Sequence, residues 1–306
     1  MIIVAGEALI DLLVHPDGRL AAVPGGGPFN TARTIARLGG EVAFLGCLST
    51  DRFGEMLRGT LGDDGVDLSM ILPTDAPTTL AIAELDERGA ATYRFHTAET
   101  SAPGLSAAAV REALATGPQA FHIGTLGLIL EPMAGALIDG LAEVPAAALV
   151  MVDPNPRPLV IHDRAAYLAR LDAVWHRADV VKASREDLAY LAPDRSAEAA
   201  ARDILDRGPT VVIVTDGGDR VLVMTRGETV AHPVPPIRVV DTVGSGDAFG
   251  GGFLARWIER GLGRDALADP ASLRDAMAVG IEVAGLTSQR AGADPPRRAD
   301  IGRDRA

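Results

Sequence analysis

Short, mostly apolar runs alternate with helical patterns along most of the chain. The apolar runs predict strands, at residues 2–5, 42–45, 120–123, 149–152, 180–182, 211–214 and 221–224. Between most of these runs the apolar residues recur at helical spacing, for example at residues 51–61, 106–115, 131–141 and 197–207. Strands that alternate with helices are typical of a mostly parallel sheet with helices on both faces. We therefore expect an α/β fold of three layers, α/β/α, in which residues 1–306 form a single domain.

Two segments do not follow this alternation. Residues 9–14 and 19–23 flank the turn sequence His15-Pro16-Asp17-Gly18, and residues 79–85 and 92–96 flank Asp86-Glu87-Arg88-Gly89. Turn residues between alternating apolar positions predict a β-hairpin in each segment. Strands without intervening helices do not fit a parallel sheet, so we expect a separate small sheet, formed by about residues 9–24 and 78–97, over the mouth of the main domain. Such a lid would exclude water from a reaction beneath it; the alternative is two surface hairpins without a role.

Composition narrows the class of protein. Apolar residues make up 47% of the chain and charged residues 23%, which is enough for a large core and too little charge for disorder. A formal net charge of -12 would repel nucleic acid and an anionic membrane, so we expect neither as a partner. Cys47 is the only cysteine, which excludes an internal disulfide and favours a reducing compartment, the cytoplasm. No stretch reaches the roughly 20 apolar residues of a transmembrane helix, and the first residues show no signal-peptide pattern.

The stretch Asp241-Thr242-Val243-Gly244-Ser245-Gly246-Asp247 carries the most specific chemistry. It follows an apolar run at residues 237–240, which predicts a strand, and it leads into a helical stretch that begins near Asp247. Glycines allow consecutive N–H groups to point at one oxyanion, and a helix N-terminus adds partial positive charge. Asp247 is then placed to take a proton from an alcohol beside a bound phosphate. This is the layout that a kinase needs, although a glycine-rich turn can also be a turn and nothing more.

The glycines that follow need a separate explanation. Gly250, Gly251 and Gly252 continue into the predicted helix, where each costs roughly 1 kcal/mol relative to alanine. The close approach of a ligand or of another backbone would explain them. The dinucleotide fingerprint G-x-G-x-x-G fails because Phe249 occupies the place of the third glycine, and no P-loop sequence occurs in the chain.

At this point the chain resembles the ribokinase-like (PfkB) carbohydrate kinases, whose C-terminal signature reads D-T-x-G-[AS]-G-D. A second block, Gly25-Gly26-Gly27-Pro28-Phe29-Asn30-Thr31-Ala32, is similar to the N-terminal G-G-x-x-x-N-x-A element of that family, and Leu38-Gly39 follows it as in the family. The resemblance covers essentially the whole chain. It implies a ribokinase-like fold, ATP and Mg²⁺ as cofactors, and a homodimer formed through the lid. It leaves open a monovalent cation, K⁺, at the Asp241 loop.

The resemblance also assigns the sugar side of the site. Asp11 interrupts the apolar run at residues 9–13, which on sequence alone equally fits a solvated face. The family places a substrate-binding Asp at this position, where two carboxylate oxygens match two hydroxyls. Gly26, Gly27 and Asn30 match the substrate-binding glycines and Asn of the family; the alternative is a plain loop that enters a helix.

Arg157 is the remaining candidate on the sugar side. The loop Asp153-Pro154-Asn155-Pro156-Arg157-Pro158 follows a predicted strand, at the carboxyl end of the sheet, where open α/β folds bind ligands. Its prolines restrict the direction in which Arg157 points. Fructokinases and 2-keto-3-deoxygluconate kinases carry a similar D-P-N-x-R element, in which the Arg faces the substrate or the transferred phosphate. A surface charge on a proline-rich loop is the alternative.

The nucleotide side rests on weaker matches. Lys182-Ala183-Ser184-Arg185-Glu186 is similar to the N-x-x-E element of the family, in which the Glu organises Mg²⁺ through water, but Ser184 replaces the Asn. A helix start, with Ser184 as N-cap and Glu186 in the first turn, explains these residues equally well. Thr215-Asp216-Gly217-Gly218 resembles the turn that lies along ATP, although Arg220 replaces a later glycine. The resemblance assigns Lys182, Ser184, Thr215, Gly217 and Thr242 to the nucleotide, Glu186 to Mg²⁺ through water, and Asp241 to the monovalent cation.

These elements together predict ATP-dependent phosphorylation of a primary hydroxyl of a sugar. Asp247 would accept the hydroxyl proton, while the N–H groups of Gly244, Ser245 and Gly246 stabilise charge on the transferred phosphoryl group. Residues 6–11 and the D-P-N-P-R loop resemble fructokinase more than ribokinase or adenosine kinase, so we expect fructose to become fructose 6-phosphate. The alternatives are 2-keto-3-deoxygluconate kinase, because Arg157 can also meet a carboxylate, and ribokinase. A non-catalytic sugar- or nucleotide-binding regulator is the alternative from another class, and the intact Asp247 disfavours it.

Overall fold

The middle layer of the molecule is a nine-stranded sheet, described here from a computed structural model that covers residues 1–86 and 91–302. Its parallel strands are β1 (Ile2–Ala5), β4 (Val42–Ser49), β5 (Ile71–Thr74), β8 (Ala120–Gly124), β9 (Leu149–Asp153), β10 (Val180–Ser184) and β11 (Val211–Asp216). Two further strands, β12 (Arg220–Met224) and β13 (Thr229–Pro233), run antiparallel at one edge. The order across the sheet is β13-β12-β11-β10-β9-β8-β1-β4-β5.

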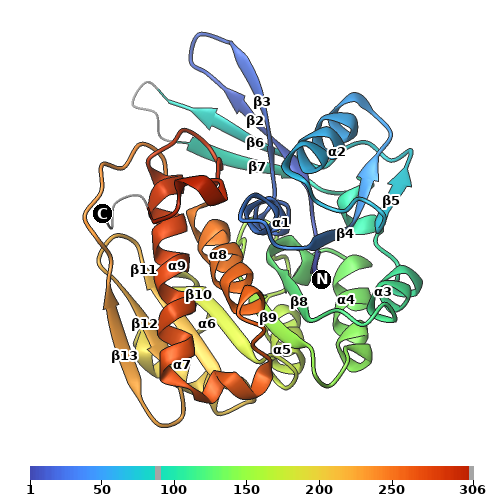
Figure 1. Cartoon of the computed structure of the whole chain (residues 1–306). Coiled ribbons are helices and arrows are strands. Elements are labelled where there is room, and N and C mark those ends of the chain that lie inside the picture. The colour runs from blue at the N-terminus through green and yellow to red at the C-terminus, as the bar shows by residue number, and fades with distance from the viewer. Residues whose placement is uncertain (87–90, 303–306) are drawn as a thin grey trace.

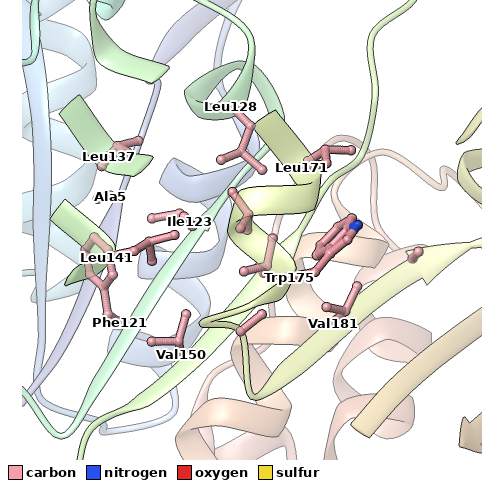
Figure 2. Packing of buried hydrophobic residues seen from close by; sticks show 14 of the residues in the cluster. Ala5, Phe121, Ile123, Leu128, Leu137, Leu141, Val150, Leu171, Trp175 and Val181 are labelled. Carbon is pink, nitrogen blue, oxygen red and sulfur yellow. The ribbon is translucent and has the colours of Figure 1, made fainter. Parts of the chain in front are cut away.

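Helices cover both faces of this sheet, as the sequence predicts (Figure 1). One face is covered by α1 (Gly27–Arg37), α2 (Arg52–Asp64), α8 (Ser245–Glu259) and α9 (Pro270–Ser288). The other is covered by α3 (Ala107–Leu114), α4 (Met133–Gly140), α5 (Arg164–Trp175), α6 (Arg185–Leu191) and α7 (Ala197–Leu205). Each strand supplies alternate residues to the two layers, because successive side chains of a strand point to opposite faces. In β1, Ile2 and Val4 pack toward α1 and α8, whereas Ile3 and Ala5 pack in the layer shown in Figure 2.

Both predicted hairpins form, and they join into a separate small sheet. The strands are β2 (Leu9–Val14), β3 (Leu20–Gly25), β6 (Leu80–Leu85) and β7 (Ala91–His96), in the order β3-β2-β6-β7. Each hairpin is antiparallel, and the central pair, β2 and β6, is parallel. Figure 1 shows these strands together beyond one end of the main body. Residues 87–90 of the second predicted turn, including Glu87, Arg88 and Gly89, lie outside the described residues.

The predicted strand at residues 237–240 is wrong. This segment is an extended connection that leaves the sheet after β13, and Val239 and Val240 are 57% and 58% exposed. The prolines at positions 235 and 236 precede it and have no N–H to donate to a sheet ladder. The N–H groups of Val240 and Asp241 donate instead to the carbonyl of Ser288, at 2.8 and 3.2 Å, which ties the segment to the end of α9. The strand predicted at residues 221–224 exists as β12, but it is antiparallel to its neighbour β11.

The C-terminal segment is held against the body up to residue 302. Arg298 pairs with Glu259 of α8 at 2.6 Å, and Arg37 of α1 donates to the carbonyl of Pro295 at 2.6 Å. Residues 303–306 lie outside the described part of the chain. Among the described helices, none combines the length and the apolar character that a bilayer span requires.

Candidate active site

A pocket of about 790 Å³ lies between the small sheet and the carboxyl ends of the parallel strands. Asp11 and Phe95 reach it from the small sheet, Ser184 and Thr215 from the ends of β10 and β11, and Asp247 from the first turn of α8. The other predicted site residues that line it are Gly26, Gly27, Asn30, Arg157, Lys182, Glu186, Gly217, Thr242, Gly244, Ser245 and Gly246. Asp241 does not line the pocket, but it begins the loop that does. The fold thus brings together at one opening residues that lie more than two hundred positions apart in the sequence.

Helix α8 begins at the pocket with a left-handed glycine. Gly244 is the N-cap residue, with a φ of 74°, and a Cβ there would collide with the side chain of Ala293. Gly246 is different, because it lies inside the helix with an ordinary φ; a Cβ there would come within 3.3 Å of Lys182 Nζ. The N–H of Ser245 donates to the carbonyl of Thr242 at 3.2 Å, so this amide already has an acceptor. Gly244 and Gly246 have no such acceptor within the described residues, and they are the better anion donors of the three.

Asp247 lies on the floor of the pocket, in the first turn of α8. Its Oδ2 accepts a hydrogen bond from Asn30 Nδ2 at 2.9 Å, and the Cβ that Gly27 lacks would lie 3.4 Å from its Oδ1. Burial raises the pKa of Asp247 to about 7; the Asn30 hydrogen bond and the nearby Lys182 and Arg157 oppose the rise, whereas the charge of Asp153 adds to it. A carboxylate with a pKa near 7 is suited to accept a proton at neutral pH.

Asn30 and Thr31 of α1 both form hydrogen bonds to Asp247. The oxygen of the Asn30 side chain, Oδ1, is buried and has no hydrogen-bond partner among the described residues, so it is available to a ligand hydroxyl. Thr31 Oγ1 donates to the main-chain carbonyl of Asp247 at 3.3 Å, which joins α1 to α8 next to the site. The N-terminal glycine-rich motif and the C-terminal motif at residues 241–247 are therefore joined by hydrogen bonds.

Asp11 faces the pocket, and the solvated-face alternative does not hold. Burial raises its pKa to about 6, and the charge of Arg157 partly opposes this rise. Gly25, which pairs with Leu9 in the hairpin, explains how the Asp11 carboxylate fits, because a Cβ at Gly25 would collide with Asp11 Oδ2. With this pKa Asp11 is mostly ionised at neutral pH, and its partly desolvated carboxylate readily accepts hydrogen bonds from the hydroxyls of a bound ligand.

The loop after β9 fixes Arg157 in the pocket. Asn155 has a φ of 31°, which turns the loop back on itself. Arg157 Nη1 then donates to the Asn155 carbonyl at 3.2 Å and also to Asn155 Oδ1. The guanidinium is therefore held by its own loop. It is close enough to Glu7, Asp11 and Asp247 for its charge to oppose the rise in pKa that burial causes in each.

Glu7 is a site residue that the sequence reasoning missed. It is 2% exposed and borders the pocket just beyond β1. Its Oε1 accepts from the N–H of Gly27 at 3.1 Å and from the hydroxyl of Thr125, while Oε2 accepts from the N–H of Gly127 at 3.1 Å. Burial raises the pKa of Glu7 to about 7. A carboxylate between the apolar runs at residues 2–5 and 8–10 was the available signal, since such a group needs buried partners.

At the other end of the pocket, Ser184 is the N-cap residue of helix α6, which is the alternative that the sequence left open. Its hydroxyl accepts from the N–H of Asp187 at 3.0 Å, and the Asp187 carboxylate accepts from the N–H of Ser184 at 2.7 Å, which forms a capping box. A cap of this kind stabilises a helix by about 1 kcal/mol. Glu186 is in the same first turn and does reach the pocket, as do Thr215, Gly217 and Thr242.

Lys182 and Asp241 have protein partners. Lys182 Nζ pairs with Asp153 Oδ2 at 2.5 Å in the interior below α8. Asp241 Oδ1 accepts from the N–H of Val243 at 3.0 Å, and its Oδ2 accepts from the N–H of Gly292 at 2.8 Å. Asp241 thus joins the loop before α8 to the loop after α9. No cluster of three or more metal-binding His, Cys, Asp or Glu side chains occurs among the described residues.

A buried carboxylate, amides without a backbone acceptor among the described residues at the start of a helix, and a wall of polar side chains are an arrangement suited to phosphoryl transfer. Residues 1–300 match the pfkB family carbohydrate kinases, and the chain belongs to that family. A fructokinase of Salmonella typhimurium is 34% identical over 271 residues, which cover 87% of each chain.

Solved structures agree with this assignment. The fructokinase of Xylella fastidiosa with bound ATP superposes with a TM-score of 0.89 at 30% identity, over 95% of this chain and 93% of that one. The aminoimidazole riboside kinase of Salmonella enterica superposes with a TM-score of 0.82 at 25% identity, over 95% and 94% of the two chains. The expectations of a ribokinase-like fold and of an ATP-dependent carbohydrate kinase are thereby confirmed.

Proposed function

We propose that this carbohydrate kinase transfers the γ-phosphoryl group of ATP to a primary hydroxyl of fructose, forming fructose 6-phosphate. The observation that carries the proposal is the Asp247 carboxylate, which lies between the amides at the start of α8 and the polar wall of Asp11 and Arg157. The similarity to fructokinases supports fructose as the sugar.

The reaction follows from what these residues can do. Asp247 accepts the proton of the hydroxyl while that oxygen forms a bond to the γ-phosphorus, and the bond from phosphorus to the bridging oxygen of ADP breaks. Asn30 holds the carboxylate of Asp247 in place by its hydrogen bond of 2.9 Å. The amides of Gly244 and Gly246 stabilise the phosphoryl oxygens on which negative charge develops. The amide of Ser245 can contribute once its hydrogen bond to the carbonyl of Thr242 is broken.

On the sugar side, we assign hydroxyl recognition to Asp11 and to the free Oδ1 of Asn30. Gly26 and Gly27 allow the backbone close to the sugar. Gly26 has a φ of 114°, and a Cβ there would come within 2.7 Å of the Glu7 carbonyl oxygen. Arg157 is assigned to the sugar oxygens or the incoming phosphoryl group.

On the nucleotide side, we assign Lys182, Ser184, Thr215, Gly217 and Thr242 to ATP, and all five line the pocket. Glu186 would hold Mg²⁺ through water, and Mg²⁺ supplies positive charge to the phosphates. Asp241 is the candidate for a K⁺ site, because it ties together the two loops beside the start of α8. We further propose that the small sheet acts as a lid, that two copies pair through it, and that the enzyme works in the cytoplasm, where ATP is available.

The substitution Asp247→Asn tests the assignment of the base. It keeps the size of the side chain and most of its hydrogen bonding but removes the proton acceptor. We expect kcat to fall by at least ~10²-fold with little change in the KM for the sugar, as for the loss of a general base. A variant that keeps more than about a tenth of the wild-type kcat would assign Asp247 a structural role.

A substrate panel tests the choice of sugar. ADP release is measured with fructose, ribose, 2-keto-3-deoxygluconate and a nucleoside, and we expect the highest kcat/KM with fructose. Preference for the keto-acid would favour the role of Arg157 as a carboxylate partner. Turnover of the nucleoside alone would contradict the fructokinase assignment and leave the kinase assignment intact.

A further inference from the structure

A buried ion pair lies directly below the first turn of α8. Lys182 Nζ of β10 and Asp153 Oδ2, at the end of the adjacent strand β9, are 2.5 Å apart, and the side chains are only 5% and 6% exposed. The second oxygen, Asp153 Oδ1, is buried without a hydrogen-bond partner among the described residues. Burial of an ion pair is costly, and a well-packed apolar pair is often at least as stable. The position of this pair therefore suggests a role other than stability.

The ammonium group lies at the point where the helix meets the phosphate site. A Cβ on Gly246 would come within 3.3 Å of Lys182 Nζ, and a Cβ on Gly250 would lie 4.0 Å from Lys182 Cδ. The stem of the lysine therefore runs along the first turns of α8, and its charge lies behind the amide of Gly246. Lys182 also borders the pocket itself. Its cation adds to the partial positive charge of the helix N-terminus at the same place.

The charge of the lysine is maintained by its surroundings. Burial acts to lower the pKa of Lys182, but Asp153, with Asp187 and Asp247, outweighs it and raises the pKa above its usual range. His122 in β8 adds no competing charge, because burial and the nearby Lys182 lower its pKa to about 3. Lys182 therefore stays positively charged below the first turn of α8.

The groups that face Asp247 come from several elements. Asn30 of α1 donates to it, Arg157 of the loop after β9 and Lys182 of β10 favour its ionised form, and Asp153 at the end of β9 disfavours that form. Glu7, beyond β1, borders the same pocket. Lys182 and Asp153 are thus electrically coupled to the proposed base without touching it.

We propose that Asp153 and Lys182 are a positioning pair for phosphoryl transfer: Asp153 holds the ammonium group of Lys182 beneath the amide of Gly246, where its charge stabilises the transferred phosphoryl group and the ionised Asp247. The proposal rests on the proposed function for the role of Asp247 as the base. It gives Asp153, which the sequence reasoning did not select, a function through Lys182.

Three substitutions separate this role from simple packing. Lys182→Met removes the cation, and we expect kcat to fall by at least ~10-fold with little change in the KM for the sugar, because a charge that matters in the transition state is lost. Asp153→Asn removes a negative charge that disfavours ionisation of Asp247. It also releases the ammonium group of Lys182, so we expect kcat to fall several-fold with little change in the KM for the sugar. In Lys182→Met the acidic limb of the profile of kcat/KM against pH should move up by about 1 pH unit, because loss of a nearby positive charge raises a carboxyl pKa. Lys182→Arg keeps the charge, so its kcat should lie above that of Lys182→Met.

The matched control is Asp179→Asn, at the opposite end of the same strands. Asp179 is 2% exposed and accepts from Arg264 at 2.7 Å and from the N–H of Val150 at 2.7 Å. Its substitution should lower the melting temperature without moving the pH profile. Circular dichroism and thermal melts accompany every kinetic measurement, and Asp153→Asn and Lys182→Arg remain informative if Lys182→Met does not fold.

The proposal is overturned if folded Lys182→Met has kcat within about twofold of wild type or an unchanged acidic limb, or if folded Asp153→Asn keeps the wild-type kcat. If the proposal is overturned in this way and Asp247→Asn is inactive, the assignment of Asp247 as the base is retained and only the role of Asp153 and Lys182 is rejected. An active Asp247→Asn shows instead that the proposed mechanism itself is wrong.

Discussion

Asp11 and Arg157 approach the sugar end of the pocket from different sheets, and this separates their expected effects. Asp11 belongs to the small sheet, while Arg157 is held in the main body by the carbonyl and side chain of Asn155. If Asp11 binds hydroxyls, Asp11→Ala should raise KM for every accepted sugar, because the pair is lost from the ground state and the transition state alike. Steady-state kinetics on two sugars measure this, and an unchanged KM would remove Asp11 from the sugar site.

Arg157→Ala then distinguishes the two leading substrates. With fructose the guanidinium meets neutral oxygens or the incoming phosphoryl group, so the loss should be mostly in kcat. With 2-keto-3-deoxygluconate it pairs with a carboxylate by charge-assisted bonds, and KM should rise steeply. Arg164→Ala is the matched control, because that guanidinium lies over the Tyr190 ring outside the pocket.

Some residues of the site could be predicted from the sequence, and others could not. Asp247, Asn30 and Arg157 were found because ordered motifs mark them, and all three line one pocket. Glu7 and Asp153 were not found, because their importance depends on partners from distant segments. Glu7 is explained only by the amides of residues 27 and 127, and Asp153 only by a lysine on the next strand.

At the scale of elements, the glycines of α8 are explained mainly by helix packing. A Cβ on Gly251 would come within 2.6 Å of Thr34 Cβ in α1, and one on Gly252 within 3.1 Å of Val283 in α9. The predicted close approach of another backbone is thus confirmed at these positions. At Gly250 a Cβ would meet Met151 Cε at 3.5 Å and Lys182 Cδ at 4.0 Å, both of which are ordinary van der Waals distances.

This difference gives a paired prediction. Gly251→Ala should destabilise the protein by about 1–3 kcal/mol, because α1 must move away from α8. Gly250→Ala has room for its methyl group and should be neutral or stabilising by up to about 1 kcal/mol, since alanine favours helix. Denaturant unfolding of the two variants measures both values. Equal losses would show that the packing of α8 against α1 does not determine the cost.

The elements that the sequence identified are those with a strong internal pattern. The buried parallel strands are continuous apolar runs, and the helices of residues 52–64 and 107–114 begin after the side-chain caps Asp51 and Ser106. β13 was missed because it is a half-exposed edge strand that includes polar residues and ends in a proline. The segment at residues 237–240 was misassigned because its apolar side chains look like a strand, whereas its backbone binds the end of α9.

At the scale of the whole molecule, the small sheet has two distinct faces. The register places Asp11, Ala81 and Phe95 side by side, toward the pocket. The alternate row places Leu12 beside Ile82 on the opposite face, and both are half-buried. Leu20 at the start of β3 is 64% exposed. Arg94 and Glu84 lie on the same face and form an ion pair, so this face combines apolar and charged side chains on the side that does not cover the pocket. A face of this kind is suited to an interface with a second copy.

The proposed dimer through the small sheet can therefore be tested at that face. Sedimentation velocity of the wild type at micromolar concentration should give a dimer, and Leu12→Arg or Ile82→Arg should give a folded monomer, because each introduces a charge into a desolvated contact. Met56→Arg is the control, since Met56 is an exposed apolar residue, 39% accessible, on α2. A wild-type monomer would contradict the proposal directly, and a dimer that survives both substitutions would place the interface elsewhere on the molecule. Sugar kinetics of the monomeric variant then decide whether pairing matters for closure: if the partner helps to hold the lid over the pocket, KM for the sugar rises while the pH dependence set by Asp247 stays unchanged.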